Sequence, residues 1–225
     1  MMDRTERTEY VYILMDMDGT ICDSARGILN SLRYSLDYLG ITVPDDDTLR
    51  AFLGPPIRVS YKNLFGLEGE KLETAVAKYR ERYVPIGMFE NDLYPGIADL
   101  IKDLKADGRK LSLATGKVHS MAADILEHFG LLQYFDFVAG CELDGRRSFK
   151  SEIIDYALEY LGALGSVEKG RAVMIGDRYH DIVGAAESGV KSIGVLYGYG
   201  TREEIEEHGA DYTAASVDEL RGILL

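Results

Sequence analysis

Two carboxylates that follow a short apolar run offer the clearest chemistry in this sequence. Asp16 and Asp18 stand in the segment Asp16-Met17-Asp18-Gly19-Thr20, directly after the run Tyr10–Met15. Because side chains alternate along an extended strand, both carboxylates point to the same side, and Gly19 permits a tight turn away from the strand. Like charges held this close repel each other unless a cation compensates them, and such oxygen ligands suit Mg²⁺. The alternative interpretation is a turn held by Asx hydrogen bonds.

A second acidic cluster, Asp177 with Asp181, follows another apolar run, Ala172–Ile175. Asp177 stands where that predicted strand ends. Asp181 lies near the start of the next predicted helix, where a carboxylate can also serve simply as a helix cap. Because the carboxyl ends of parallel strands share one crevice, we expect the two acidic clusters to meet there.

A hydroxyl and a lysine complete the set of candidate site residues. Thr115, Gly116 and Lys117 follow a third apolar run, and a hydroxyl next to amide-rich backbone is suited to holding phosphate oxygens. The spacing of a Walker motif is absent. Lys150 comes immediately before a predicted helix, Ser151–Leu161, and a plain surface lysine is the alternative interpretation.

Five short apolar runs rich in β-branched residues predict the strands that position these side chains. They are Tyr10–Met15, Lys110–Ala114, Phe135–Ala139, Ala172–Ile175 and Ser192–Val195. Runs that are nearly continuous rather than alternating are typical of strands buried on both faces. Stretches of helical periodicity separate them, for example over residues 97–104 and 153–161. The sequence therefore predicts an α/β fold, a Rossmann-like doubly wound parallel sheet with its ligand crevice at the carboxyl ends of the strands.

The segment 22–90 interrupts this alternation, because it contains no strand-like run. Leu29, Leu32, Leu36 and Leu39 have helical spacing, and a further helix is expected over Lys71–Val84. We therefore predict a small all-helical cap domain at 22–90, inserted after the first strand. Residues 1–21 and 91–225 then form the core domain.

Within this cap, the segment Gly54-Pro55-Pro56 forms a rigid turn that opens a helix. Arg58 and Lys62 lie one turn apart on one face of that helix. On spacing alone, both residues are consistent with solvated side chains of a surface helix.

Composition excludes several classes of protein. The 225 residues include 25 Lys and Arg against 38 Asp and Glu, a net charge of −13, while apolar residues make up 46%. This acidity argues against nucleic-acid partners and against anionic membranes, both of which require basic patches. The apolar content supports a sizeable core.

Two features of the sequence bear on location. Cys22 and Cys141 stand far apart without a disulfide or zinc pattern, which fits a reducing cytoplasm. The segment Met1–Glu9 is polar, and the apolar run behind it is too short for a signal peptide or a membrane span. We expect a cytoplasmic protein, as a monomer or weak homodimer.

Taken together, the four motifs resemble those of the haloacid dehalogenase-like (HAD) superfamily of phosphohydrolases. Asp16-Met17-Asp18-Gly19-Thr20 is similar to the first motif, Thr115 to the second, Lys150 to the third, and Asp177 with Asp181 to the fourth. The resemblance covers essentially the whole chain. The helical insert resembles the small cap of the subgroup that contains phosphoglycolate phosphatases, β-phosphoglucomutases and some 5′-nucleotidases.

This resemblance implies a mechanism with named roles. Asp16 would be the nucleophile that forms an aspartyl-phosphate, and Asp18 the general acid and then the general base. Mg²⁺ would be held by Asp16, the backbone carbonyl of Asp18 and Asp177, with Asp181 as an outer-sphere or additional ligand. Thr115, Gly116 and Lys150 would bind the phosphoryl group. Lys117 or Arg178 would add positive charge, and His119 would lie near the crevice rim. In the resemblance the loop Gly54-Pro55-Pro56 overhangs the crevice, so Arg58 would be a candidate for binding an anionic or polar end of the substrate.

We therefore expect a Mg²⁺-dependent phosphatase acting on a small phosphorylated metabolite, either a phosphoglycolate-like acid or a 5′-nucleotide. Asp18 favours a phosphatase or a phosphomutase over a dehalogenase or a transport ATPase, which do not carry Asp at this place. A sugar phosphomutase of the β-phosphoglucomutase type shares every motif and is the alternative. A non-catalytic binding module on the same scaffold predicts that a catalytic side chain is lost, and none is.

Overall fold

The computed structural model describes residues 10–143 and 146–225. The polar segment Met1–Glu9 and residues 144–145, within the expected loop 141–149, lie outside the described residues. The chain forms two compact units, Met1–Ile21 with Tyr94–Leu225, and Cys22–Leu93. The boundary expected at residue 90 falls slightly before the one in the structure.

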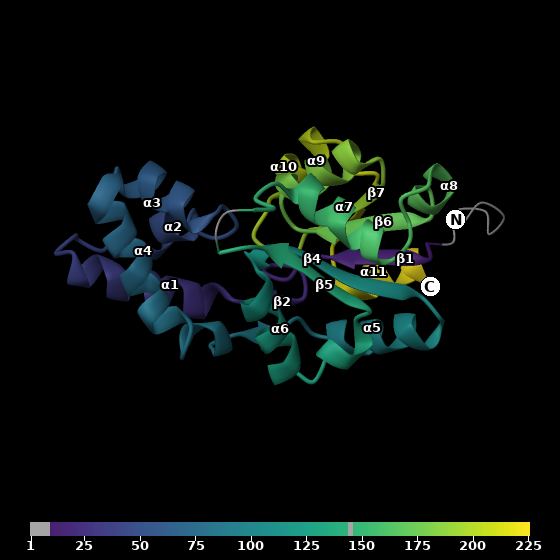
Figure 1. Ribbon diagram of the computed structural model, residues 1–225, viewed down its shortest axis with the longest axis horizontal. Coiled ribbons are helices and arrows are strands. Elements are labelled where there is room, and N and C mark those ends of the chain that lie inside the picture. Colours follow the sequence, from purple (N-terminus) through teal and green to yellow (C-terminus); the bar gives the residue numbers. More distant parts are fainter. Residues whose placement is uncertain (1–9, 144–145) are drawn as a thin grey trace. The chain divides into compact units, whose positions relative to one another are not determined.

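Six parallel strands form the centre of the first unit, in the order β5-β4-β1-β6-β7-β8 (Figure 1). Strand β1, at the middle, has Met15 opposite both Leu113 of β4 and Ile175 of β6. The chain therefore leaves the sheet at one common edge after three neighbouring strands. The strands are β1 (Tyr12–Met15), β4 (Lys110–Val118), β5 (Phe137–Cys141), β6 (Ala172–Gly176), β7 (Lys191–Val195) and β8 (Tyr212–Ala214).

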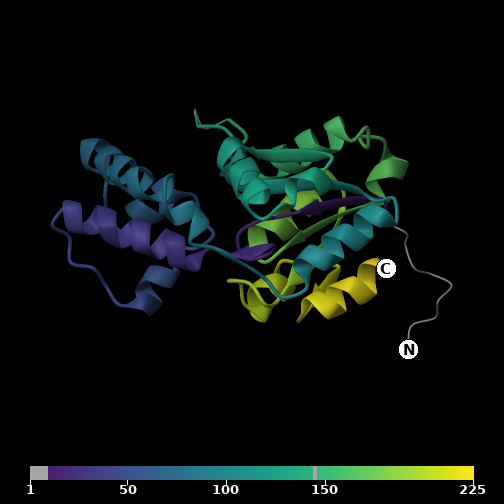
Figure 2. The ribbon, with the colours of Figure 1, turned by 90° about the horizontal axis from the view of Figure 1, so that it is seen from below.

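Helices cover both faces of this sheet (Figures 1 and 2). On one face, α7 and α9 pack against each other and against the strands; on the other, α5 packs against α11. The helices and the 3₁₀ turn η2 are α5 (Ile97–Ala106), α6 (His119–His128), η2 (Leu132–Tyr134), α7 (Lys150–Tyr160), α8 (Ser166–Lys169), α9 (Tyr179–Ser188), α10 (Arg202–Glu207) and α11 (Val217–Leu224). This arrangement confirms the predicted doubly wound α/β fold.

The core beneath α7 and α9 explains why the strands read as continuous apolar runs. Leu14 of β1 and Met174 of β6 are fully buried there together with Ile153 and Leu158 of α7. Alanines of β4, β5, β6, α7 and α9 complete the cluster, and their small side chains allow the helices to approach the sheet closely.

Helices make up most of the second unit, which is coloured purple to blue in Figure 1. Its elements are β2 (Cys22–Asp23), α1 (Ala25–Tyr38), α2 (Asp46–Arg50), α3 (Ile57–Phe65), α4 (Gly69–Tyr83), the 3₁₀ turn η1 (Gly87–Phe89) and β3 (Asp92–Leu93). The long helices α1 and α4 pack together. Strands β2 and β3 pair antiparallel, with Cys22 opposite Leu93. This two-stranded ribbon adds β structure to a unit expected to be all-helical, because two-residue strands have no detectable periodicity.

Packing in the second unit is very tight where α1 lies against the 3₁₀ turn η1. A Cβ atom on Gly27 would lie 1.8 Å from the carbonyl oxygen of Gly87, so only glycine fits in this turn of α1. Nearby, the guanidinium of Arg82 donates two hydrogen bonds to Glu90, at 2.8 and 3.0 Å, and a third to the Ser31 hydroxyl at 3.2 Å. Both features connect α1 and α4 with the segment that leads out of the unit.

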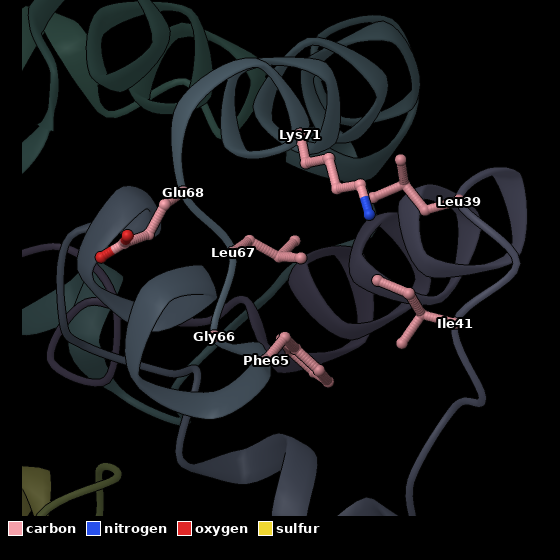
Figure 3. Close-up of a pocket in the computed structure, with 7 residues that line it drawn as sticks. All are labelled: Leu39, Ile41, Phe65, Gly66, Leu67, Glu68 and Lys71. Carbon is pink, nitrogen blue, oxygen red and sulfur yellow. The ribbon is translucent and has the colours of Figure 1, made fainter.

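A pocket of about 540 Å³ also lies in the second unit, between the ends of α1 and α3 and the start of α4 (Figure 3). Leu39, Ile41, Phe65 and Leu67 provide apolar walls, and Lys71 extends over them. Glu68, also at this pocket, is ion-paired with Lys62 at 2.9 Å. The residues named as lining this pocket do not include a cluster of groups able to transfer a phosphoryl group.

Among the described residues, no helix has the length and apolarity needed to cross a membrane.

Candidate functional site

Three carboxylates gather at the carboxyl edge of the sheet. Asp16 follows β1, and Asp177 follows β6, the strand beside it. Asp181 comes from the first turn of α9, which begins two residues after Asp177. One carboxylate oxygen of each residue lies within 4.8 Å of the others. The two acidic clusters expected from the sequence therefore meet at one place.

Asp181 serves as a helix cap and also belongs to the acidic cluster, the two roles expected for it from the sequence. Its Oδ2 accepts a hydrogen bond from the backbone N–H of Arg178 at 3.1 Å, as a residue in the first turn of a helix often does. Its Oδ1 lies 2.6 Å from Nζ of Lys150. The side chain is buried, so Asp181 orients the lysine while capping α9.

Lys150 provides a positive charge between the carboxylates. It is the first residue of α7, and its side chain is only 8% exposed. Its Nζ lies 3.3 Å from Asp16 Oδ2 as well as close to Asp181, and it donates to the backbone carbonyl of Ala114 at 3.0 Å. Burial opposes the charged form, but Asp16 and Asp181 outweigh burial and raise the lysine pKa above its ordinary value. The interpretation of Lys150 as a surface lysine does not hold in this geometry.

Burial is the largest cause of the raised carboxylate pKa values, and repulsion between the carboxylates adds to it. Burial raises the pKa of Asp16 to about 6; Lys150 lowers it, whereas Asp181 raises it further. Burial also raises the pKa of Asp177 well above its ordinary value, with Asp181 and Asp16 adding to the effect. One lysine therefore does not fully compensate three buried carboxylates, and a bound cation would relieve the remaining repulsion.

One oxygen of Asp177 is unused by the protein. Its Oδ2 accepts a hydrogen bond from the backbone N–H of Tyr199 at 2.7 Å. Its Oδ1 is buried and has no hydrogen-bond partner among the described residues. A buried carboxylate oxygen without a partner is costly. It suits a hard divalent cation such as Mg²⁺, which binds oxygen ligands.

Glycines surround these carboxylates on several sides. Gly19 has a φ of +78°, and a Cβ there would lie 2.1 Å from Asp177 Oδ2. A Cβ on Gly198 would lie 2.4 Å from the Cβ of Asp177, and one on Gly176 would lie 2.1 Å from Cγ of Asp181. The backbone thus closes around the acidic groups, which keeps their positions fixed. The glycines in the run Tyr197-Gly198-Tyr199-Gly200 could have indicated this close approach of the backbone to Asp177, but the sequence alone did not reveal their role.

The end of β4 brings in the phosphate-binding candidates. The pairing of β4 with β5 shifts register between Thr115 and Val118, which turns the strand out of regular alternation. Thr115 is buried, and its side chain hydrogen-bonds Asp16. The backbone N–H of Lys117 donates to Thr115 Oγ1 at 3.2 Å. Gly116 is exposed and has open space around it, as a contact point for a ligand requires.

Asp18 occupies a different environment from the other three aspartates. Its Oδ2 lies 3.0 Å from Nζ of Lys117, and its side chain is not a member of the three-carboxylate group. Within the described residues, Asp18 Oδ1 is buried without a hydrogen-bond partner. Sequence reasoning did not find the contact with Lys117, because the two residues come from different strand ends and no spacing rule connects them.

Three further candidates make other contacts. In the second unit, Arg58 forms a two-pronged ion pair with Glu73, with N···O distances of 3.0 and 2.7 Å. In the first unit, His119 donates from Nδ1 to the carbonyl of Val138 at 2.8 Å. Arg178 donates from Nε to Glu204 at 2.9 Å.

Comparison with known proteins agrees with this geometry. Residues 13–195 match the model of the family described as haloacid dehalogenase-like hydrolase. A 5′-nucleotidase from Pseudomonas aeruginosa is 37% identical over 221 residues, covering 98% of each chain. The tyrosine-protein kinase PtkA from Mycobacterium tuberculosis is 39% identical over 214 residues, covering 94% of this chain and 72% of that protein.

A solved structure gives the same result at the level of the fold. The crystal structure of a predicted phosphatase from Clostridium acetobutylicum superimposes with a TM-score of 0.88 at 43% identity, covering 95% of this chain and 97% of that one. The resemblance inferred from the four motifs is therefore confirmed. The chain belongs to the haloacid dehalogenase-like hydrolases, and it is an enzyme of their phosphatase type.

Proposed function

We propose that this enzyme is a Mg²⁺-dependent phosphatase that hydrolyses a small phosphorylated metabolite through an aspartyl-phosphate. The observation that carries the proposal is the pair formed by Asp16 and the buried Lys150, beside the unpartnered oxygen of Asp177. A carboxylate nucleophile, a fixed positive charge and a carboxylate oxygen available to a metal ion are the components that phosphoryl transfer requires.

Asp16 acts as the nucleophile. One of its carboxylate oxygens forms a bond to phosphorus while the bond from phosphorus to the leaving oxygen breaks, and Asp18 gives its proton to that oxygen. In the second half of the reaction, Asp18 takes a proton from water as the water oxygen attacks phosphorus. The Asp16–phosphorus bond then breaks, and inorganic phosphate and the free carboxylate result.

Thr115, Gly116 and Lys150 hold the phosphoryl group during both halves. Lys150 Nζ already lies 3.3 Å from Asp16, so its charge is in place before a substrate arrives. Such preorganised charge is worth more in a buried site than in water. Thr115, hydrogen-bonded to Asp16, lies beside the same carboxylate.

The acidic group fits Mg²⁺. Asp16 and Asp177 would hold the ion together with the backbone carbonyl of Asp18, and Asp181, which contacts Lys150 and caps α9, would act as an outer-sphere or additional ligand. When bound, Mg²⁺ neutralises charge on the phosphoryl oxygens and lowers the repulsion between them and the carboxylates.

For the substrate we favour 5′-nucleotides, with phosphoglycolate-like acids second. Support for this order comes from the relative named 5′-nucleotidase, which matches nearly the whole chain. Arg58 would contribute to the choice by exchanging Glu73 for an anionic or polar group of the substrate. The net charge of −13 argues against nucleic-acid and anionic-membrane partners. We further propose a cytoplasmic enzyme that is a monomer or weak homodimer.

The experiment that tests this function measures phosphate release from a panel of 5′-nucleotides, phosphoglycolate and sugar phosphates, with Mg²⁺ and with EDTA. We expect Asp16→Asn to lose essentially all activity. Asp99→Asn is the matched control, because Asp99 is an exposed residue of α5 that pairs with Lys102. Turnover by Asp16→Asn at the wild-type rate would refute the nucleophile assignment, and full activity in EDTA would refute the metal requirement.

Two other reactions share the phosphoryl-transfer chemistry, and the same panel separates them. A sugar phosphomutase of the β-phosphoglucomutase type would convert β-glucose 1-phosphate to glucose 6-phosphate instead of releasing phosphate. The second reaction is tyrosine phosphorylation, which the likeness to a protein named a tyrosine kinase makes worth testing. With ATP labelled at the γ-phosphate, a kinase would place the label on a tyrosine, whereas a phosphatase would release it as inorganic phosphate.

A further inference from the structure

We infer that Lys117 is a positioning residue that holds the carboxylate of Asp18 in place for proton transfer to the leaving group. The inference rests on the proposed phosphatase function and adds a residue to it. Lys117 Nζ lies 3.0 Å from Asp18 Oδ2, and the lysine side chain is only 7% exposed. A lysine this deeply buried is rare unless its charge is paired with another group.

The two buried lysines of the site have separate partners. Lys150 contacts Asp16, Asp181 and the carbonyl of Ala114. Lys117 forms an ion pair with Asp18, which is not among the contacts of Lys150 with the described residues named above. Positive charge is thus divided between the nucleophile and the residue that moves protons.

The backbone of Lys117 fixes where its side chain begins. The register shift at the end of β4 lies between Thr115 and Val118, and within it the N–H of Lys117 donates to Thr115 Oγ1. Thr115 in turn hydrogen-bonds Asp16. Asp16 and Asp18 are therefore linked through Thr115 and Lys117, in addition to their neighbouring positions in the chain.

This arrangement leaves one oxygen of Asp18 for the reaction. With Oδ2 held by Lys117, the opposite oxygen, Oδ1, has no hydrogen-bond partner among the described residues. A general acid must place its proton within hydrogen-bond reach of the leaving oxygen. Without Lys117 the Asp18 carboxylate could rotate, and productive orientations would be less populated.

The inference predicts a dependence on the leaving group. An alkyl phosphate expels a strongly basic alkoxide that needs a proton, whereas p-nitrophenyl phosphate expels a weakly basic phenolate that does not. Loss of a residue that works through Asp18 should therefore slow the first half of the reaction, release of the alcohol, selectively for alkyl phosphates; the attack of water in the second half is common to both substrates. A lysine that binds the substrate itself would instead raise KM, and a merely structural lysine would affect both substrates equally.

The experiment compares Lys117→Met, Lys117→Arg and the surface control Lys102→Met on an alkyl phosphate and on p-nitrophenyl phosphate. For Lys117→Met we expect the single-turnover rate of alcohol release from the alkyl phosphate to fall about 10- to 100-fold, up to the lower end of the roughly 10²–10⁴-fold that general acid–base catalysis contributes. We expect the single-turnover rate of p-nitrophenol release, and the half-saturating concentrations of both substrates, to stay within about threefold of wild type. Lys117→Arg should recover most of the loss, because it returns a charge within reach of Asp18.

A double-variant cycle with Asp18→Asn completes the test. If Lys117 acts through Asp18, adding Lys117→Met to Asp18→Asn should change the single-turnover rate of alcohol release from the alkyl phosphate by less than about threefold. Equal losses on both substrates, a rise in KM alone, or independent effects in the cycle would overturn the inference. If Lys117→Met does not fold, as judged by circular dichroism, Lys117→Gln is measured in its place with the same expected selectivity.

Failure of this inference is distinguishable from failure of the proposed function. Wild type that hydrolyses the alkyl phosphate, with an inactive Asp16→Asn, keeps the phosphatase function whatever Lys117 does. An active Asp16→Asn variant, or wild type that releases no phosphate, would overturn the proposed function and this inference with it.

Discussion

Replacing Lys150 by methionine gives the most direct test of the charge balance at the site. Methionine keeps most of the side-chain volume but removes the only described cation that contacts both Asp16 and Asp181, at 3.3 and 2.6 Å. At an effective dielectric constant of about 20, each contact represents roughly 5 kcal/mol of Coulomb attraction. Burial of the lysine offsets much of this energy. Removing one partner of a buried pair typically costs about 3–5 kcal/mol.

The size of the loss should depend on pH. Burial raises the pKa of Asp16 to about 6, above its unfolded value of 3.8, and Lys150 opposes that rise. A carboxyl with a raised folded-state pKa destabilises the fold progressively as pH increases through this window. In Lys150→Met the pKa rises further. The stability deficit of the variant should therefore be smaller at pH 5, where Asp16 is largely protonated, than at pH 8.

The assay is thermal unfolding of the metal-free proteins in EDTA at pH 5 and at pH 8. A loss of about 3–5 kcal/mol corresponds to roughly 10 °C in Tm for a chain of this size. We expect a deficit of that order at pH 8, a clearly smaller one at pH 5, and partial recovery at pH 8 with Mg²⁺. Lys102→Met is the control, since Lys102 is 48% exposed and pairs only across the helix surface with Asp99. Equal Tm deficits at the two pH values would refute the charge argument.

Three further predictions concern the metal, the packing and an ion pair of the cap. Mg²⁺ should raise the Tm of wild type but not of Asp177→Asn, which loses the unpartnered buried oxygen; an equal rise in both would place the ion elsewhere. Gly27→Ala should lower Tm, because its Cβ would lie 1.8 Å from the Gly87 carbonyl, whereas Gly222→Ala in α11, with open space around it, should raise stability by about 0.5–1 kcal/mol. Finally, the hydrogen bonds from Arg82 lower the pKa of Glu90, so the stability they provide is present above about pH 4.3 and is lost as pH falls below it. Urea unfolding of Glu90→Gln should therefore show a deficit relative to wild type at pH 7 that shrinks towards pH 3, and a constant deficit would contradict this.

Most of the fold could be predicted because its strands are buried on both faces. The observed β1, β4, β5, β6 and β7 overlap the five expected apolar runs. Strand β8 was not predicted, since Tyr212–Ala214 is a three-residue edge strand with a threonine at its centre. The ribbon of β2 and β3 was missed for a similar reason, because pairing across about seventy residues leaves no local pattern.

The candidate site was predictable where it depends on strand ends and not where it depends on contacts between loops. The positions of Asp16 and Asp177 follow from two parallel strands ending at one edge. Lys150 required the family resemblance, because a lone lysine before a helix carries no signal. The contact of Lys117 with Asp18 and the register shift that permits it became visible only in three dimensions.

The ribbon formed by β2 and β3 has a consequence for how this enzyme can be altered. Cys22 and Leu93 are opposite each other in an antiparallel pair, so the chain enters and leaves the second unit at neighbouring points. A segment with adjacent ends can be exchanged as a cassette, because a replacement needs only to begin and end within one strand spacing. If the second unit selects the substrate, exchange of this segment would change the substrate range while the strand ends of the first unit stay the same.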